Sequence, residues 1–359
     1  MDVLRLAGVP GVGKSTVAWA VARGLAADGE RVGYIDIDQL GMCYAAPPDD
    51  PDRWDLKEVA LQRVAARFAE AGVERLVVSG VADPAEPPRA NGHPTVSLWL
   101  DAEEVTRRER LAPRVWPQGQ VDEVVAIGTA ESGTAHPSWA KFDTDGSAVD
   151  ETVRTVLARW RTDAATAATT VAPAPAPAST EDDVTGRVIW ITGPRCSGAS
   201  SVAWEIASAR WAEGLRTGFV DVTQLGFAWN AHRAVGTRNT AEMQGLFAGV
   251  GAQTLVVTAP FEIGPAEVGR ALPHADLRFF RLDADPETLR ARAVRRTTGE
   301  GPRIIGDDLL DGAPEAVDLA VAQGVRQRQT PVRSGEQMID ATASSASEVA
   351  EEVRAHLPD

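Results

Sequence analysis

The chain has 359 residues, a formal net charge of −15 at pH 7 and 44% apolar residues. This length suits two ordinary domains with sizeable cores, and the apolar content excludes wholesale disorder. Both halves of the sequence are acidic, which argues against sequence-independent binding to a nucleic-acid backbone because such binding needs a basic face.

The sequence contains two cysteines without metal-ligand spacing, no signal-peptide pattern and no apolar run of about 18 residues. We therefore expect a cytoplasmic protein that does not enter the membrane. The sequence leaves its oligomeric state open.

The first half alternates short apolar runs with stretches of helical periodicity. Strands are predicted at 3–8, 31–38, 76–78, 95–100 and 141–143. Helices are predicted at 15–27, 55–71, 102–112 and 148–161, and residues 113–140 are expected to form an irregular lid region interrupted by Pro and Gly. Strands that alternate with helices predict a parallel α/β sheet.

An Ala/Pro-rich segment interrupts this alternation. Residues 162–185 include the run Ala-Pro-Ala-Pro-Ala-Pro, which favours extended polyproline II and is typical of a solvent-exposed linker. The sequence therefore predicts one domain at 1–161 and another at 186–359.

A complete G-x-x-x-x-G-K-[ST] motif follows the first predicted strand and begins the next helix. Its glycines let consecutive backbone N–H groups point at one anion, its lysine reaches the β- and γ-phosphates, and its first hydroxyl binds Mg²⁺. This Walker A motif predicts a site for ATP and Mg²⁺ formed by Gly8, Val9, Pro10, Gly11, Val12, Gly13, Lys14, Ser15 and Thr16.

The second half repeats the first. A shift of 185 positions aligns 8–44 with 193–229 without a gap, and fifteen of the 37 positions are identical. Such self-similarity predicts a tandem duplication. The second copy lacks two of the chemical groups, because Ala199 stands in place of Lys14 and Thr223 in place of Asp38. We therefore predict a degenerate second copy, a pseudokinase domain that keeps the fold and has lost phosphoryl transfer.

The loop at 8–16, the Asp36-Ile37-Asp38 run and an arginine-bearing helix together give the first domain a resemblance to P-loop small-molecule kinases, such as shikimate, gluconate and nucleoside monophosphate kinases. The resemblance implies two tandem P-loop NTPase domains, each with a mostly parallel five-stranded sheet flanked by helices. It also implies that Asp36 helps Ser15 to hold Mg²⁺ and that Asp38 contacts the acceptor hydroxyl. Because Asp36 and Asp38 both lie on the strand predicted at 31–38, alternation points both side chains the same way, at the carboxyl edge of the sheet. Because Asp36 is kept as Asp221 in the second copy, a capping role in a turn is the alternative for it.

Arg110 and Arg114 are four residues apart on the predicted helix at 102–112 and just beyond it. Residues at that spacing share a helix face, and two arginines there can stabilise charge on a transferring phosphoryl group. A solvated basic face, paired with neighbouring glutamates, is the alternative for both.

These observations lead to a primary hypothesis: an ATP-dependent phosphotransferase that acts on a small hydroxyl-bearing acceptor, with Lys14, Asp38, Arg110 and Arg114 as catalytic residues. The alternative is an ATP-binding regulatory or scaffold protein without a small-molecule substrate. A third interpretation, a kinase of RNA ends, is disfavoured by the acidic charge of both halves.

Overall fold

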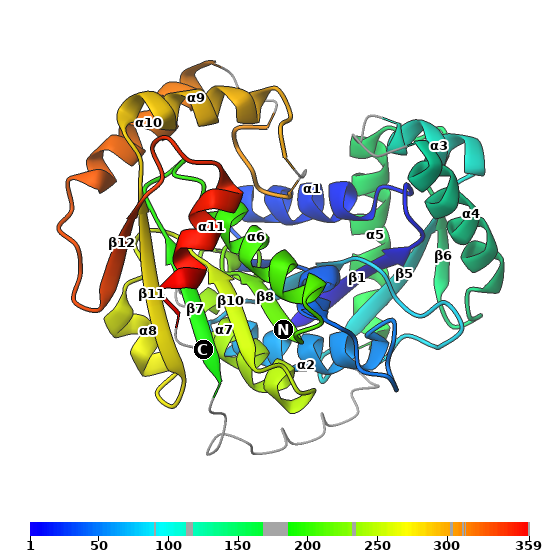
Figure 1. Cartoon of the computed structure of the whole chain (residues 1–359). Helices are drawn as coiled ribbons and strands as arrows, with labels where there is room; N and C mark the ends of the chain where they lie inside the picture. The colour runs from blue at the N-terminus through cyan, green and yellow to red at the C-terminus, as the bar shows by residue number, and fades with distance from the viewer. Residues whose placement is uncertain are drawn as a thin grey trace. The chain divides into compact units, whose positions relative to one another are not determined.

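The computed structural model describes residues 1–89, 91–112, 118–167, 186–231, 235–301, 304–310, 312 and 314–357. The chain is α/β, with two mixed six-stranded sheets (Figure 1). It divides into two compact units. Unit 1 comprises 1–41, 50–177 and 226–235, and unit 2 comprises 42–49, 178–225 and 236–359.

Unit 1 begins with the strand that leads into the glycine-rich motif. Its strands are β1 (Asp2–Gly8), β2 (Val32–Asp36), β4 (Arg75–Ser79), β5 (Thr95–Asp101), β6 (Ala140–Asp143) and β9 (Phe227–Trp229). Its helices are α1 (Lys14–Ala27), the 3-10 helix η1 (Ile37–Gly41), α2 (Trp54–Glu70), α3 (Glu104–Leu111), α4 (Gln118–Thr134) and α5 (Val149–Ala167). The sheet order is β6-β5-β1-β4-β2-β9.

Unit 2 has a corresponding strand order, β12-β11-β7-β10-β8-β3. Its strands are β3 (Cys43–Tyr44), β7 (Arg187–Thr192), β8 (Thr217–Asp221), β10 (Thr254–Thr258), β11 (Asp276–Asp283) and β12 (Glu336–Asp340). Its helices are α6 (Ala199–Ala212), α7 (Val235–Gly249), α8 (Pro265–Ala271), α9 (Pro286–Thr297), α10 (Pro314–Arg328) and α11 (Ala346–Ala355).

Each sheet ends in a strand that comes from the other half of the sequence. In unit 1, β9 pairs antiparallel with β2, with Tyr34 opposite Phe227 and Val32 opposite Trp229. In unit 2, β3 pairs antiparallel with β8, and Cys43 lies opposite Gly218. The other neighbouring strands are parallel. The prediction of five-stranded sheets is therefore corrected to six, because each parallel sheet gains one short antiparallel edge strand.

Helices cover both faces of the unit 1 sheet. Successive strand residues point to opposite faces. Tyr34 of β2 packs against Trp19 of α1, with ring centroids 5.2 Å apart. A Cβ on the preceding residue, Gly33, would lie 2.9 Å from Phe68 of α2. Helices α1 and α2 thus pack on opposite faces, and the absent side chain of Gly33 makes room for Phe68.

The elements expected at the start of the chain are present within one or two residues. Two regions differ. The lid region expected to be irregular contains the 17-residue helix α4, and α5 continues to Ala167, beyond the expected start of the linker. The rest of that linker, 168–185, lies outside the described residues. Among the residues that the structure describes, no helix is both long and apolar enough to cross a membrane.

Candidate nucleotide site

Glycines shape the loop that joins β1 to α1. Gly8, Gly11 and Gly13 have φ values of 139°, 89° and 91°, a region that residues with a side chain rarely adopt. A Cβ on Gly8 would lie 2.2 Å from the carbonyl oxygen of Leu100, and one on Gly11 would lie 2.9 Å from that of Arg107. The curled loop therefore depends on these glycines, both for its backbone angles and for its close packing on β5 and α3.

Lys14 is the first residue of α1, directly after the N-cap Gly13. Its Nζ donates to the carbonyl oxygen of Val9 at 3.0 Å, so the side chain reaches back along the loop. A positive charge held over the loop, together with the N-terminus of α1, gives an environment that favours a phosphate anion.

Ser15 and Asp36 meet at the carboxyl edge of the sheet. Ser15 Oγ donates to Asp36 Oδ2 at 3.0 Å, and Ser79 Oγ donates to the same oxygen at 3.1 Å. Burial, with a further contribution from the nearby Asp38, raises the pKa of Asp36 to about 6. A hydroxyl and a carboxylate in contact are hard oxygen ligands of the kind that Mg²⁺ prefers, so these two residues fit the expected cation. The described residues contain no cluster of three or more His, Cys, Asp or Glu side chains that could hold a metal by itself.

Ser79, the last residue of β4, was missed by the sequence reasoning. Its hydroxyl contacts both Asp36 and the Tyr34 hydroxyl, the latter at 2.8 Å. The strand thus ends in a hydroxyl that holds Asp36 in place. The signal in the sequence that could have identified Ser79 is a polar residue at the end of a buried strand.

Asp38 lies in η1, because β2 ends at Asp36. The expected strand alternation from 36 to 38 is therefore wrong. Instead, the backbone N–H of Asp38 donates to Asp36 Oδ1 at 3.0 Å, a local turn bond that places the two carboxylates near each other. The same bond links Thr223 to Asp221 in unit 2, at 2.9 Å, so the capping alternative for Asp36 accounts for one of its contacts.

Lys57 of α2 was also missed. Its side chain is 8% exposed, and its Nζ lies 3.6 Å from Asp38 Oδ1 and 4.5 Å from the centroid of the Trp54 ring. Burial lowers the pKa of Lys57, and the negative charge of Asp38 opposes that change. Lys57 therefore holds Asp38 against α2, and no local sequence motif links the two residues.

Arg110 of α3 hydrogen-bonds to the backbone of the loop between β1 and α1. Its guanidinium donates to the Val12 carbonyl oxygen at 3.3 Å and to both the hydroxyl and the carbonyl of Thr144, at 3.0 and 2.8 Å. Arg292 makes the corresponding contact in unit 2, with the carbonyl of Ser197. These contacts favour a positioning role for Arg110. Arg114 lies outside the described residues.

Replacing Arg110 with alanine is expected to lower the free energy of unfolding by about 2 kcal/mol, because hydrogen bonds from a charged donor are lost, and to weaken ATP binding. Arg292→Ala is the matched control, since it removes the corresponding support in unit 2. Thermal melting and ATP calorimetry on both variants check this. Equal effects of the two substitutions on ATP affinity would contradict the assignment.

The corresponding loop of unit 2 is closed by its own chain. Cys196 has φ 68° where unit 1 has Gly11, and the Ser197 N–H donates to the Pro194 carbonyl at 2.9 Å. In unit 1 the equivalent carbonyl, that of Val9, accepts from Lys14. With Ala199 there is no ammonium group at this position of the second loop.

Helix α10 also packs on the second loop. The Arg195 N–H donates to Gln327 Oε1 at 2.7 Å, and the Arg195 guanidinium pairs with Gln323 and Asp308. A Cβ on Gly324 would lie 2.6 Å from the Arg195 carbonyl oxygen. Arg195, the cation nearest to this loop in sequence, is thus engaged within the protein.

No family model matches the chain, and no curated protein matches it at a significant level. Similar solved structures include small-molecule kinases and a tunicamycin resistance protein from Deinococcus radiodurans (16% identity, TM-score 0.30, 47% of this chain and 94% of that one). They include a gluconokinase from Sinorhizobium meliloti 1021 (21% identity, TM-score 0.31, 46% of this chain and 94% of that one) and a sugar kinase from a Janibacter species (21%, 0.31, 47% and 98%). A shikimate kinase from Aquifex aeolicus is also similar (16%, 0.27, 46% and 99%).

Each of these structures aligns almost completely with less than half of this chain. The identities and TM-scores are too low to carry function from one protein to another. Any function for this chain must therefore be argued from its own loop and carboxylates.

Proposed function

We propose that the chain is an ATP-binding phosphotransferase whose site lies in unit 1 and transfers the γ-phosphoryl group to a small hydroxyl-bearing acceptor. The observation that carries the proposal is the lysine-bearing loop with Ser15 hydrogen-bonded to Asp36 at 3.0 Å beside it. A loop that only turns a strand into a helix does not need the ammonium group, and unit 2, which lacks that group, keeps the carboxylate only as Asp221.

In this mechanism the loop N–H groups and Lys14 bind and orient the phosphates. Ser15 and Asp36 hold Mg²⁺, which when bound offsets negative charge on the phosphates. The acceptor oxygen forms a bond to the γ-phosphorus, the bond from that phosphorus to the bridging β,γ-oxygen breaks, and ADP leaves. Asp38 accepts the proton of the acceptor hydroxyl, and Lys57 keeps Asp38 in place.

We further infer that the chain arose by duplication and that its second copy has lost transfer. The matching strand orders, the internal sequence identity and the shared Asp36/Asp221 turns support the duplication. Loss of transfer is supported by Ala199 and Thr223, and by the Arg195 N–H, which already bonds to Gln327.

A regulatory or scaffold protein that responds to ATP is the second candidate. The closed loop of unit 2 favours it, since a whole unit of the chain is retained without the groups needed for transfer. The Asp38–Lys57 pair favours the enzyme, because a nucleotide sensor has no need of a second carboxylate directed to an acceptor.

Calorimetry with ATP and Mg²⁺ is expected to give one site per chain, because only unit 1 has a loop with an ammonium group. The same preparation should move label from γ-labelled ATP to a hydroxyl compound in a broad screen. Two sites per chain would contradict the closed second loop. Tight binding of ATP with no labelled acceptor in the screen would favour the regulatory candidate.

A further inference from the structure

The two edge strands that come from the other half of the sequence occupy the same place in the internal repeat. The shift of 185 positions places 43–44, the bounds of β3, on 228–229 of β9. The same shift places 32–36, the bounds of β2, on 217–221, the bounds of β8. Each half of the sequence therefore gives the same segment to the other half and receives it on the same strand.

The pairing register is also the same in both sheets. In unit 1, Gly33 of β2 lies opposite Ala228 of β9, and in unit 2, Gly218 of β8 lies opposite Cys43 of β3. These two pairs are equivalent positions of the repeat. An exchange in which each partner gives and receives the same element has the pattern of a two-fold symmetric dimer, which is realised here within one chain.

In unit 1 the exchanged strand completes an aromatic cluster. Phe227 and Trp229 of β9 lie on Trp19 of α1, with ring centroids 4.8 and 5.2 Å away. Asn230, directly after β9, donates through Nδ2 to the carbonyl of Glu30 at 3.0 Å. Unit 1 therefore binds the exchanged segment by side chains as well as by backbone pairing.

In unit 2 the exchanged strand makes contacts of the same kind. Tyr44 of β3 packs on Trp211 of α6 with ring centroids 4.9 Å apart, and Met42 packs against the buried core of the unit. The Arg216 guanidinium donates to the carbonyl of Ala45 at 2.8 Å. The segment from the first half is thus anchored on both sides of its backbone pairing with β8.

Each half of the sequence carries one open edge and one segment that fits the edge of the other half. Without the exchanged strands, β2 and β8 would each present a row of unpaired N–H and C=O groups, and such edges bind extended segments readily. The aromatic and apolar side chains of the exchanged segments would lose their packing at the same time. The two halves are therefore complementary to each other at two separate edges.

We propose that the two halves of the chain, 1–167 and 186–359, bind each other through this reciprocal strand exchange and stay bound when the segment between them is cut. The partner for the open edge of each half is the other half of the same chain. The segment that joins them raises the effective concentration of one half for the other, and the exchanged strands hold the halves together. The inference is independent of the proposed function, since it needs neither ATP nor an acceptor.

The test uses the full chain with the recognition sequence of a specific protease inserted within 168–185. After complete cleavage, checked on a denaturing gel, analytical ultracentrifugation is expected to show one species with the mass of the uncut chain and one copy of each piece. A dilution series gives the dissociation constant of the two pieces. Pieces that sediment separately at micromolar concentration would overturn the inference.

Two double variants of the cleavable chain test whether the exchanged strands carry the association. Phe227→Ala with Trp229→Ala removes the β9 contacts, and Met42→Ala with Tyr44→Ala removes the β3 contacts. Because a few packed side chains carry most of the binding energy of an interface, either double variant should raise the dissociation constant about tenfold or more.

The matched control, Phe142→Ala with Phe279→Ala, truncates two half-buried aromatic side chains on β6 and β11, strands that stay in their own half of the sequence. It should leave the dissociation constant within about twofold, because these positions are remote from the exchanged pairs in the strand order. Circular dichroism of each uncut variant verifies the fold, and the single substitution Trp229→Ala or Tyr44→Ala replaces a double variant that does not fold. Variants of the exchanged strands that bind as tightly as the wild-type pieces, or a control that binds as weakly as those variants, would overturn the inference.

Discussion

Replacing Lys14 with alanine is expected to lower kcat/KM for phosphoryl transfer by about 10²–10³-fold, the cost of removing one preorganised donor from a developing charge. The ammonium group reaches over the loop to the Val9 carbonyl, 3.0 Å away, from where it can contact bound phosphate. Transfer kinetics with ATP as the varied substrate, alongside thermal melting to verify the fold, check this. Undiminished transfer by the variant would exclude the proposed site.

The chain offers a matched control for this substitution, because it contains only three lysines. Lys141 is exposed on β6, so Lys141→Ala removes the same charge from the surface and should leave kcat/KM within about twofold. A reduction as large as that of Lys14→Ala would point to a loss of overall charge as the cause.

The substitution Ala199→Lys restores the ammonium group to the loop of unit 2. Calorimetry of this variant should still show one ATP site per chain. The loop of unit 2 has its Ser197 N–H bonded to Pro194 and its Arg195 N–H bonded to Gln327. The Ser197 bond belongs to a turn that both loops form, whereas the bond from Arg195 to Gln327 occupies a backbone donor of the unit 2 loop. The missing ammonium group is therefore not the only difference between the two loops.

The sequence predicted the parts of the structure that local patterns determine. The first strand, the glycine-rich loop and α1 follow from an apolar run, a motif and a helical repeat in direct succession. The contact between Ser15 and Asp36 was predictable because Ser15 lies just after β1 and Asp36 ends β2, and the carboxyl ends of parallel strands meet at one edge of the sheet. In contrast, α4 has glycines at 119, 128 and 133 and weak contrast between its faces, so its sequence resembles a loop.

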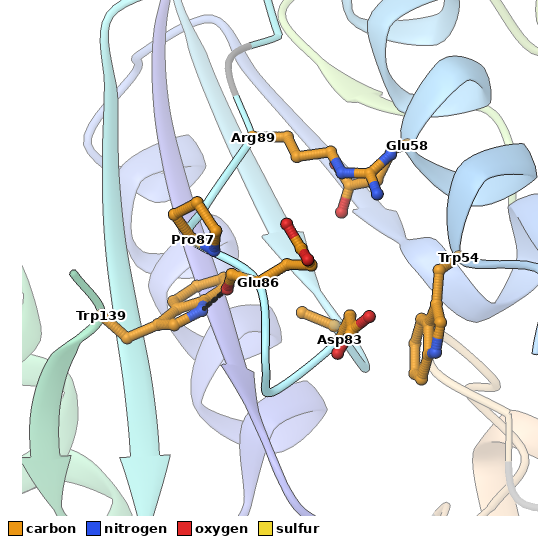
Figure 2. A pocket seen from close by; sticks show the side chains of 8 residues that line it. Trp54, Glu58, Asp83, Glu86, Pro87, Arg89 and Trp139 are labelled. Carbon is orange, nitrogen blue, oxygen red and sulfur yellow. Dashed lines mark hydrogen bonds between the residues drawn. The ribbon is translucent and has the colours of Figure 1, made fainter. Parts of the chain in front are cut away.

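The features missed depend on contacts between segments far apart in the sequence. Strands β3 and β9 have only two and three residues. Such short segments cannot show the alternation of apolar and polar residues by which a strand is recognised. Lys57 is an ordinary lysine on an amphipathic helix until the fold places it 3.6 Å from Asp38. Trp54 at the start of α2, Asp83 in the loop after β4 and Trp139 line one small hollow (Figure 2), and no sequence spacing indicates that these segments converge.

The fragment 1–167, which lacks β9, is expected to melt about 10 °C below unit 1 of the intact chain. In the intact chain Phe227 and Trp229 of β9 pack on Trp19, with ring centroids 4.8 and 5.2 Å apart. Loss of two half-buried aromatic side chains and their ring contacts costs about 3–5 kcal/mol. A domain of this size loses about 2–4 °C per kcal/mol.

Loss of β9 should also affect the nucleotide site and solubility. Strand β2 would become the edge of the sheet, with its unpaired N–H and C=O groups available to other chains. Because β2 ends at Asp36, fraying of this edge would loosen the carboxylate that contacts Ser15. We therefore expect the fragment to bind ATP more weakly than the intact chain and to aggregate at lower concentration.

A second fragment isolates the role of the strand itself. Residues 226–231 attached to 1–167 through a Gly/Ser linker restore β9, including the bond from Asn230 Nδ2 to the Glu30 carbonyl at 3.0 Å, and supply nothing of unit 2. Differential scanning calorimetry and ATP titration of both fragments should show recovery of most of the melting temperature and of the affinity in the longer one. If the two fragments melt within about 2 °C of each other, β9 contributes little to the stability of this sheet. Any stabilisation of unit 1 by the second half of the chain would then have another source.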